Sequence, residues 1–369
     1  MRVLYITNDS GLSGSTIALK NLLSYLIPLG VEPFCVCRNE GDFTEWCLSK
    51  NIPYSVFPYN WNYQPLRITV QDKLAYYWRI HKYYQEEKKC MLELEKICKE
   101  FRPDIIHSNN GIIHWGYKVA KKNGIKHVWH LREYQDKDFN MTPIPSMEAF
   151  CRMAQDSNCI CITKGVQDHF HLTPENSKVI YDGVLPKRSC RYCKEKEDYF
   201  LFVGRIELSK GIEELLQAYY EYNKRGGTTP LWIAGSGKPQ YVKERMNEAE
   251  RNSSLVKFLG FRSDRLDLMY KAKAIIVPSR FEGFGFITVE AIMNGCFVIG
   301  HNTGGTSEIA QNCKSVYLYD TKEDLINLLM NLEYNSKKMK ESQEYAELNY
   351  TNEESANQVL NFYQIIKYE

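Results

Sequence analysis

The sequence lacks the two features that would mark the chain for a membrane or for export. No apolar run approaches the roughly 18 residues that a membrane-spanning helix needs. Residues 1–11, MRVLYITNDSG, begin directly with a strand-like pattern and carry no signal-peptide pattern. We therefore expect a cytoplasmic protein, which could still touch a membrane peripherally from that side.

The sequence also lacks an excess of charge of either sign. Its 47 lysines and arginines nearly balance its 45 aspartates and glutamates, so the formal net charge is +2. Because binding to nucleic acid requires a basic surface, we expect no nucleic-acid partner. The 369 residues suffice for about two domains that each bury their own core.

Cysteine is present without a pattern. The 12 cysteines are irregularly spaced, in a chain too long for a small disulfide-stapled scaffold. Cys190 and Cys193 form one isolated C-x-x-C pair, and no second pair stands at the spacing of a zinc site. We expect reduced, mostly structural thiols and no bound metal.

What the chain does contain is an alternation of short β-rich segments with helical patterns, which runs through two halves. This rhythm is typical of a parallel sheet covered by helices. A polar stretch, residues 185–198, separates the halves and is the best linker candidate. We expect strands in residues 2–7, 33–37, 104–108, 126–131 and 158–163, and again in 199–204, 230–235, 256–260, 274–279, 296–300 and 315–319.

The predicted fold class is therefore α/β, with two tandem, doubly wound, Rossmann-like parallel-sheet domains. Residues 1–184 form the first domain and residues 199–351 the second. Residues 352–369 read as a helix that Thr351 or Asn352 can cap, and we expect this helix to join the first domain.

Residues 70–101 form one long helical pattern with an unusual composition. An amphipathic helix packed on the sheet explains this pattern. Alternatively, its aromatic and basic face, with Arg79 and Lys82, contacts a sugar ligand or a membrane surface, because aromatic rings stack on sugars and sit at bilayer interfaces. The aromatic residues crowd its first half, at Tyr76, Tyr77, Trp78, Tyr83 and Tyr84.

Glycines and cations follow several predicted strands, where parallel sheets bind ligands. Gly14 follows the first strand and leads into a helix, but its loop is neither G-x-G-x-x-G nor G-x-x-x-x-G-K-[ST], which disfavours a nucleotide dehydrogenase or a P-loop. Gly204 and Arg205 end another strand, and Lys210 opens the next helix. Two such cations would suit a diphosphate. Ordinary turns and surface charge are the alternatives.

Two further glycine segments stand in the second half. Gly235 lies in IAGSGK, which lacks a third glycine at fingerprint spacing. Gly304 and Gly305 precede a predicted helix, whose first amides could cradle a phosphate.

Two carboxylates flank a glycine-rich turn in residues 277–295. Glu282 lies in the exit loop of a predicted strand and Glu290 lies on the following helix, so they need not share a helix face. Gly283 and Gly285 allow the backbone to approach a ligand. Two carboxylates could also be the acid–base pair of a hydrolase, but the phosphate-binding features around them disfavour that function.

Two histidines, His107 and His130, end predicted strands of the first half. Either could face a ligand cleft. A structural histidine with satisfied hydrogen bonds is the alternative for each.

Together these motifs resemble those of the retaining GT-B glycosyltransferases of family 4. Glu282 and Glu290 match the family's E-x7-E signature. GRIELSKG is similar to its Arg/Lys diphosphate site, GGTSEI to its phosphate loop, and HVWHLRE to the segment that carries the histidine of the catalytic centre. The resemblance is strongest over residues 199–310 and weakest over 55–100.

The resemblance implies roles for these residues. Arg205 and Lys210 would bind the donor diphosphate, Glu282 the hydroxyls of the donor sugar, and Glu290 the ribose, while His130 would lie beside the reacting sugar and the acceptor. His130, Glu282, Arg205 and Lys210 are thus the expected catalytic residues. The other expected donor-binding residues are Gly14, Gly204, Gly235, Gly283, Phe284, Gly285, Gly304, Gly305 and Thr306.

The expected function is transfer of a sugar from a nucleoside-diphosphate sugar, UDP before GDP, to a glycan or lipid-linked acceptor, with retention of configuration and without a cofactor or metal. Bacterial surface polysaccharide synthesis is the expected setting, and the first domain would bind the acceptor. A sugar-nucleotide epimerase or a phosphorylase on the same fold, or a non-catalytic nucleotide-sugar-binding subunit, are the alternatives.

Overall fold

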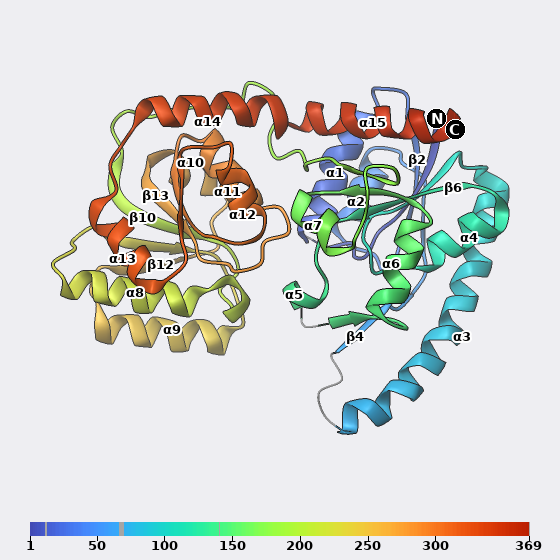
Figure 1. Cartoon of the computed structure of the whole chain (residues 1–369), viewed down its shortest axis with the longest axis horizontal. Helices are drawn as coiled ribbons and strands as arrows, with labels where there is room; N and C mark the ends of the chain where they lie inside the picture. The colour runs from blue at the N-terminus through green and yellow to red at the C-terminus, as the bar shows by residue number, and fades with distance from the viewer. Residues whose placement is uncertain (12, 66–69, 140, 369) are drawn as a thin grey trace. The chain divides into compact units, whose positions relative to one another are not determined.

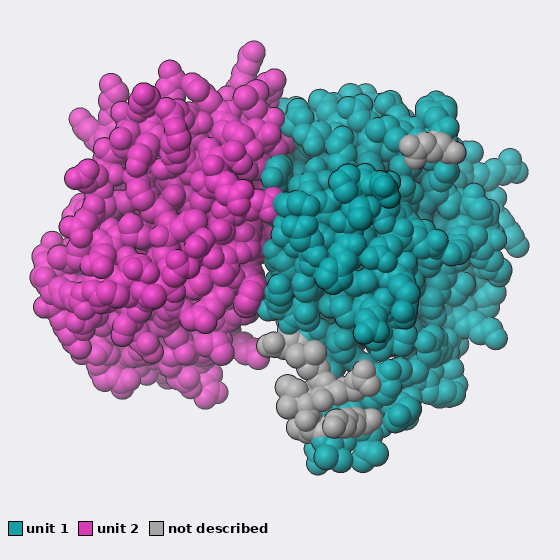
Figure 2. All heavy atoms as spheres, viewed as in Figure 1, with its two compact units in different colours: residues 1–183, 352–369 teal, residues 184–351 magenta. Residues whose placement is uncertain are grey.

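The computed structural model describes residues 1–11, 13–65, 70–139 and 141–368 (Figure 1). The chain forms two compact units, shown in different colours in Figure 2. The first unit comprises residues 1–183 together with residues 352–369, and the second comprises residues 184–351. Each unit is a parallel β-sheet with helices packed on it, so the predicted α/β class is confirmed.

The sheet of the first unit has seven strands in the order β3-β2-β1-β5-β6-β8-β9, and all neighbours are parallel. The strand order therefore reverses between β1 and β5. A separate antiparallel pair joins β4 (Tyr63–Pro65) and β7 (Met141–Pro143). The seven strands are β1 (Arg2–Ile6), β2 (Glu32–Cys37), β3 (Tyr54–Val56), β5 (Ile105–Ser108), β6 (Lys126–Leu131), β8 (Asn158–Cys161) and β9 (Ser177–Val179).

Helices cover both faces of this sheet. Leu23 of α1 and Val359 of α15 share one buried core with the sheet, whereas Leu94 of α3 and Val119 of α4 share the core on the other face. The long helix predicted over residues 70–101 is confirmed as α3. The helices are α1 (Gly14–Leu26), α2 (Asp42–Ser49), α3 (Val70–Phe101), α4 (Trp115–Asn123), α5 (Asp136–Phe139), α6 (Met147–Gln155), α7 (Lys164–His169) and α15 (Asn352–Tyr368).

The sheet of the second unit has six parallel strands in the order β12-β11-β10-β13-β14-β15, which reverses between β10 and β13. The strands are β10 (Glu197–Val203), β11 (Leu231–Ala234), β12 (Val256–Gly260), β13 (Ala272–Val277), β14 (Phe297–His301) and β15 (Val316–Tyr319). The helices are the 3-10 turn η1 (Leu208–Lys210), α8 (Ile212–Lys224), α9 (Pro239–Asn252), α10 (Arg265–Lys271), α11 (Phe286–Met293), α12 (Gly304–Ala310), α13 (Lys322–Asn331) and α14 (Ser336–Asn349).

The segment expected to be a linker, residues 185–198, is tied to the second unit. The amide of Arg191 donates to the carbonyl of Met293 at the end of α11 (2.9 Å), and Gln343 of α14 donates to the carbonyl of Arg191 (2.9 Å). The last two residues of the segment already belong to β10. Its polar composition therefore reflects a segment held by hydrogen bonds.

The chain carries its 12 cysteines as free thiols, of which Cys190 and Cys193 are partly exposed and the others are buried. Within the described ranges, no helix combines the length and the apolar character that crossing a bilayer requires. Over the same residues, no group of three or more His, Cys, Asp or Glu side chains is arranged to hold a metal ion.

The first unit buries an unusual group of histidines. His127 lies on β6, and its ring nitrogens are hydrogen-bonded to the hydroxyls of Ser108 (3.0 Å) and Ser157 (2.9 Å). Burial lowers the pKa of His127 and of His114 to about 3. Burial, together with the nearby guanidinium of Arg132, holds the pKa of His107 and His130 well below 6.5. These imidazoles are therefore neutral in the folded protein.

These pKa values predict that mild acid destabilises the first unit. As the pH falls below about 6.5 the unfolded chain binds protons that the folded chain rejects until about pH 3. The contribution of each neutral histidine to the free energy of unfolding is thus complete above pH 6.5. It is lost as the pH falls toward 3, by up to about 1.4 kcal/mol for each histidine and pH unit. His127→Gln should reduce the drop in melting temperature between pH 7 and pH 5. His81→Gln, on the exposed side of α3, is the control and should leave that drop unchanged. Equal drops in the wild type and both variants would contradict the prediction.

Candidate functional site

The predicted site residues of the second half gather where the strand order of the second unit reverses. The carboxyl ends of β10 and β13 lie side by side there, and open parallel sheets bind ligands at such a point. The loop after β10 carries Arg205 and leads to Lys210, and the loop after β13 carries Glu282. The structure therefore brings these three predicted residues to one edge of one sheet.

Lys210 and Glu282 form an ion pair across the two loops. The Nζ of Lys210 lies 2.6 Å from Oε1 of Glu282, and the side chains are 27% and 22% exposed. Gly211 permits this approach, because its φ of 70° is left-handed and a Cβ there would lie 2.3 Å from the carbonyl oxygen of Pro278. The ammonium has three donors, so an anionic ligand could share it with Glu282 or take it over.

Arg205 is held much less firmly. Its side chain is 67% exposed, and one guanidinium nitrogen lies 3.1 Å from Oε1 of Glu207. A surface pair of this kind contributes little to stability. Arg205 is consequently free to turn toward an anion at modest energetic cost.

Glu290 is buried on α11, and Arg265 at the start of α10 binds both of its carboxylate oxygens. The two contacts are 2.6 Å from Nη2 to Oε1 and 3.1 Å from Nε to Oε2. Glu282 and Glu290 therefore pair with different cations. Sequence analysis missed Arg265, because only the fold brings the helix after β12 beside α11.

The double glycine lets the loop after β13 rest directly on the start of α12. Gly304 has a left-handed φ of 58°, and a Cβ there would lie 2.6 Å from the carbonyl oxygen of Glu282. A Cβ on Gly305 would lie 1.9 Å from the carbonyl oxygen of Phe284. The amide of Gly305, which was expected to face a phosphate, donates instead to the carbonyl of Glu282 (2.7 Å).

Phe284 and Thr306 have side chains that point into the core. Phe284 is 3% exposed and packs edge-on against Tyr350, with ring centroids 5.7 Å apart. Thr306 is fully buried, and its hydroxyl lies 3.0 Å from that of Thr288. These side chains shape the loops, so only the backbone of the two residues could meet a ligand.

The other predicted glycines differ in what they do. A Cβ on Gly235 would lie 1.8 Å from the carbonyl oxygen of Gly204, so glycine at 235 is needed for the close approach of β10 and β11 at their ends, whereas a Cβ on Gly204 would meet only the ring of Phe202, at 3.6 Å. Gly285 begins α11 with a left-handed φ of 98°, and Gly283 lies in the loop before it. Gly14 is the first residue of α1 in the first unit, where a Cβ would meet nothing within 4 Å.

His130 lies in the first unit, at the end of β6, and is 1% exposed. Its ring packs against that of His107, with centroids 5.3 Å apart, and its Nε2 lies 3.8 Å from Oδ1 of Asp182. Arg132 binds Asp182 and also donates to Asn109, in the loop after β5. His130 is therefore one member of a buried polar network at the carboxyl edge of the first sheet.

Glu133 is a residue of this edge that sequence analysis missed. It lies two residues after Leu131, the end of the strand that carries His130, and Asn110 donates a hydrogen bond to its Oε1. Burial raises its pKa to about 7. A carboxyl group with such a pKa can exchange a proton near neutral pH. The signal available in the sequence was an acidic residue two positions after a predicted strand end.

Gly305→Ala should destabilise the second unit, because the new methyl group would overlap the backbone of Phe284. Overpacking of this kind costs about 1–3 kcal/mol or more, and the melting temperature should fall by several degrees. Gly14→Ala is the control and should not lower it, since its methyl group meets open space. Similar melting temperatures for the two variants would show that the loop does not rest on α12 as described.

Three comparisons bear on these observations. Residues 192–349 match the sequence model of the family Glycosyl transferases group 1. The uncharacterized glycosyltransferase MJ1607 of Methanocaldococcus jannaschii is 33% identical over 174 residues, which cover 42% of this chain and 44% of that protein. The capsular polysaccharide biosynthesis glycosyltransferase CapH of Staphylococcus aureus is 28% identical over 147 residues, covering 39% and 41%. The chain thus matches less than half the length of either relative.

The fold has a solved counterpart over its whole length. The crystal structure of Anabaena HepE in complex with UDP superposes with a TM-score of 0.77 at 19% identity, and the match covers 99% of this chain and all of that one. This likeness confirms the predicted GT-B fold. Residues 192–349, which contain Arg205, Lys210, Glu282 and Glu290, therefore match the model of the Glycosyl transferases group 1 family, in a chain that has the GT-B fold.

Proposed function

We propose that the protein is a retaining glycosyltransferase that moves a sugar from a nucleoside-diphosphate sugar to a glycan or lipid-linked acceptor. The observation that carries the proposal is the Lys210–Glu282 pair at the reversal of the second sheet, inside the segment that matches the family. UDP is the favoured nucleotide, because HepE has been crystallised with UDP and with UDP-glucose. The name of CapH supports a role in surface polysaccharide synthesis.

The cations would stabilise the leaving group. When the glycosidic bond to the diphosphate breaks, negative charge grows on the departing phosphate, and preorganised cations stabilise such charge strongly. Lys210 and the loosely held Arg205 are two cations at this edge. As Lys210 turns to the phosphate, it would release the carboxylate of Glu282 to accept hydrogen bonds from hydroxyls of the donor sugar.

Glu290 would hold the ribose. Arg265 fixes both carboxylate oxygens, yet each oxygen keeps further lone-pair directions that can accept a hydroxyl. The buried Nε2 of His130 has no hydrogen-bond partner among the described residues. A substrate hydroxyl would supply one, which fits a place beside the reacting sugar. The proposed chemistry uses these side chains and requires no metal.

The first half of α3 supports a peripheral contact with a membrane. Tyr83, which belongs to the aromatic cluster noted in the sequence, is buried, and Tyr76 is half-buried. In this half of the helix, the large apolar side chains that remain strongly exposed lie at helical spacing on one face. They are Val70 (72% exposed), Leu74 (71%), Tyr77 (75%), Trp78 (67%) and Tyr84 (45%).

The donor assignment predicts a sharp loss of activity in two variants. Arg205→Ala and Lys210→Ala should each lower turnover about 100- to 1,000-fold, because each removes one oriented charge from the transition state. Lys224→Ala, at an exposed end of α8, should keep full turnover. The measurement is UDP release from UDP-sugars with and without acceptor, together with the thermal shift that UDP causes. Full turnover in both variants would refute the diphosphate site, and donor conversion without any acceptor would favour the epimerase.

The membrane contact predicts sedimentation with anionic liposomes. Replacing Tyr77 and Trp78 with serine should weaken binding about tenfold or more, since two large apolar side chains would no longer leave water. Leu48→Ser is the control, because Leu48 of α2 is equally exposed (68%) but lies apart from this face. A wild-type protein that stays in the supernatant at low salt would disprove the contact.

A further inference from the structure

A hollow in the first unit lies outside the segment that matches the family. Its volume is about 250 Å³, and it lies between residues 60–65, the first half of α3 and Ile144. The walls include the aromatic side chains of Trp61, Tyr63, Trp78 and Tyr83. The function proposed above uses the outer side of α3 for the membrane contact and gives the hollow itself no role.

The wall of this hollow is fixed to the carboxyl edge of the first sheet. The indole Nε1 of Trp61 donates to the carbonyl of Asn8, just after β1 (2.8 Å). The amide of Asn62 donates to the carbonyl of Ile112, in the loop after β5 (2.7 Å). The hollow is therefore anchored to the two loops that flank the reversal of strand order between β1 and β5, where an open parallel sheet binds its ligands.

Two polar side chains of the lining lack partners that their burial requires. Gln64 is 2% exposed, and neither its Nε2 nor its Oε1 has a hydrogen-bond partner among the described residues. The Nη1 of Arg79 is also buried without a partner in this part of the chain. Buried amide and guanidinium groups are normally hydrogen-bonded. A ligand with hydroxyls and an acidic group would satisfy both side chains.

The remaining lining has the chemistry of a sugar site. Trp61 and Tyr63 stack on each other with ring centroids 5.6 Å apart and an interplanar angle of 11°, and the guanidinium of Arg38 lies 4.3 Å from the centroid of Trp61, so this part of the wall is a fixed aromatic stack. Arg79 and Lys82 are the charged side chains of the lining, and both are cations. Two carboxylates outside the lining contact it: Glu86 accepts a hydrogen bond from Asn60 and lies 3.8 Å from Lys82, and Glu87 accepts a hydrogen bond from the hydroxyl of Tyr83. Among the described residues, neither forms an ion pair with Arg79.

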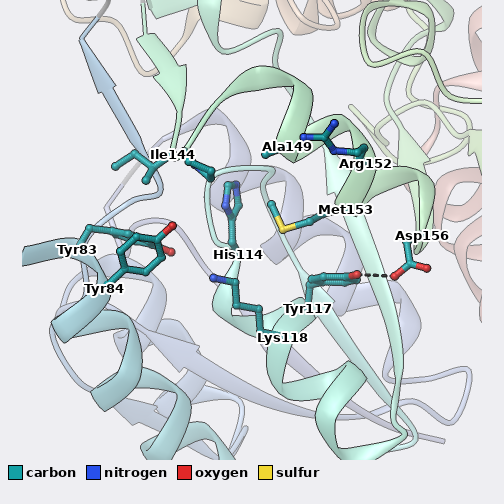
Figure 3. A pocket seen from close by; sticks show the side chains of 11 residues that line it. Tyr83, Tyr84, His114, Tyr117, Lys118, Ile144, Ala149, Arg152, Met153 and Asp156 are labelled. Carbon is teal, nitrogen blue, oxygen red and sulfur yellow. Dashed lines mark hydrogen bonds between the residues drawn. The ribbon is translucent and has the colours of Figure 1, made fainter. Parts of the chain in front are cut away.

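A larger neighbouring hollow, of about 440 Å³, shares Tyr83 and Ile144 with the first (Figure 3). In Figure 3, Tyr84 of α3 lies on one side of this space and Arg152 of α6 on the other, with His114 between them. Two of its charged groups are already paired, because Lys118 binds Glu87 and Asp156 binds Lys121, whereas Arg152 is exposed. The larger hollow thus offers room for a further sugar residue. The smaller one differs in offering a guanidinium nitrogen, the Nη1 of Arg79, that is buried without a partner among the described residues.

We propose that the smaller hollow binds an acidic sugar residue of the acceptor, with the ring against the aromatic wall, hydroxyls on Gln64 and the anionic group on Arg79. The proposal rests on the transferase function proposed above, whose acceptor it specifies. Arginine binds carboxylates and phosphates through two parallel hydrogen bonds. The anionic group is therefore the carboxylate of a uronic acid or the phosphate of a sugar phosphate.

The test is calorimetric titration of the whole protein with methyl glucuronide, glucose 1-phosphate and neutral methyl glucoside, with saturating UDP. At least one charged probe should bind more tightly than the glucoside, and which one does so identifies the acidic group. Arg79→Met should weaken that binding at least about tenfold. Lys89→Met is the control, since Lys89 is an exposed cation of the same helix outside the lining, and it should bind as the wild type does.

Gln64→Leu separates binding from folding. It removes two buried polar atoms that have no partner in the described part of the chain, so it should leave the melting temperature unchanged or raise it, while the charged probe binds more weakly. Equal binding of all three probes, unchanged binding in Arg79→Met, or a lowered melting temperature with unchanged binding in Gln64→Leu would each overturn the proposal. No step of this test requires sugar transfer. If UDP causes no thermal shift in the wild-type protein, that result would instead count against the transferase function.

Discussion

The site of the second unit depends on one backbone contact, between the loop after β13 and the start of α12. The hydrogen bond from the amide of Gly305 to the carbonyl of Glu282 fixes the main chain of that loop. With the loop fixed, the side chain of Glu282 reaches Lys210, and the chain enters α11 at Gly285 so that Glu290 faces Arg265. Two adjacent residues without side chains are what make this contact possible.

The two sheets share a principle of construction but differ in how they hold charge. The edge of the second unit keeps its cations partly exposed and paired with carboxylates, an arrangement that an incoming diphosphate can rearrange. The edge of the first unit buries neutral imidazoles around the Arg132–Asp182 pair. The arrangement in the second unit suits the binding of an anion, and the arrangement in the first unit suits rigid placement of hydrogen-bonding groups.

Much of the fold could be predicted from the sequence, because buried parallel strands are short apolar runs and α3 has an unbroken helical pattern. The three-residue strands β3, β4, β7 and β9 escaped, since such short segments carry little periodicity. Glu282 and Glu290 lie, as their sequence context predicted, in the loop after a strand and on the following helix. The sequence could not show that Phe284 and Thr306 turn inward, or that Arg265 meets Glu290, because side-chain direction and pairing between distant segments arise only on folding. The aromatic residues of α3 divide into buried and exposed ones for the same reason.

The first unit is built from two stretches of chain that are far apart in sequence. Residues 352–368 return to it as α15, where Val359, Phe362 and Tyr363 fill the core and the hydroxyl of Tyr363 lies 2.6 Å from Nδ1 of His107. During synthesis these residues leave the ribosome only after the whole second unit has emerged. The nascent first unit must therefore wait with the part of its core that α15 fills still open, while the second unit, whose chain is continuous, can finish folding before it.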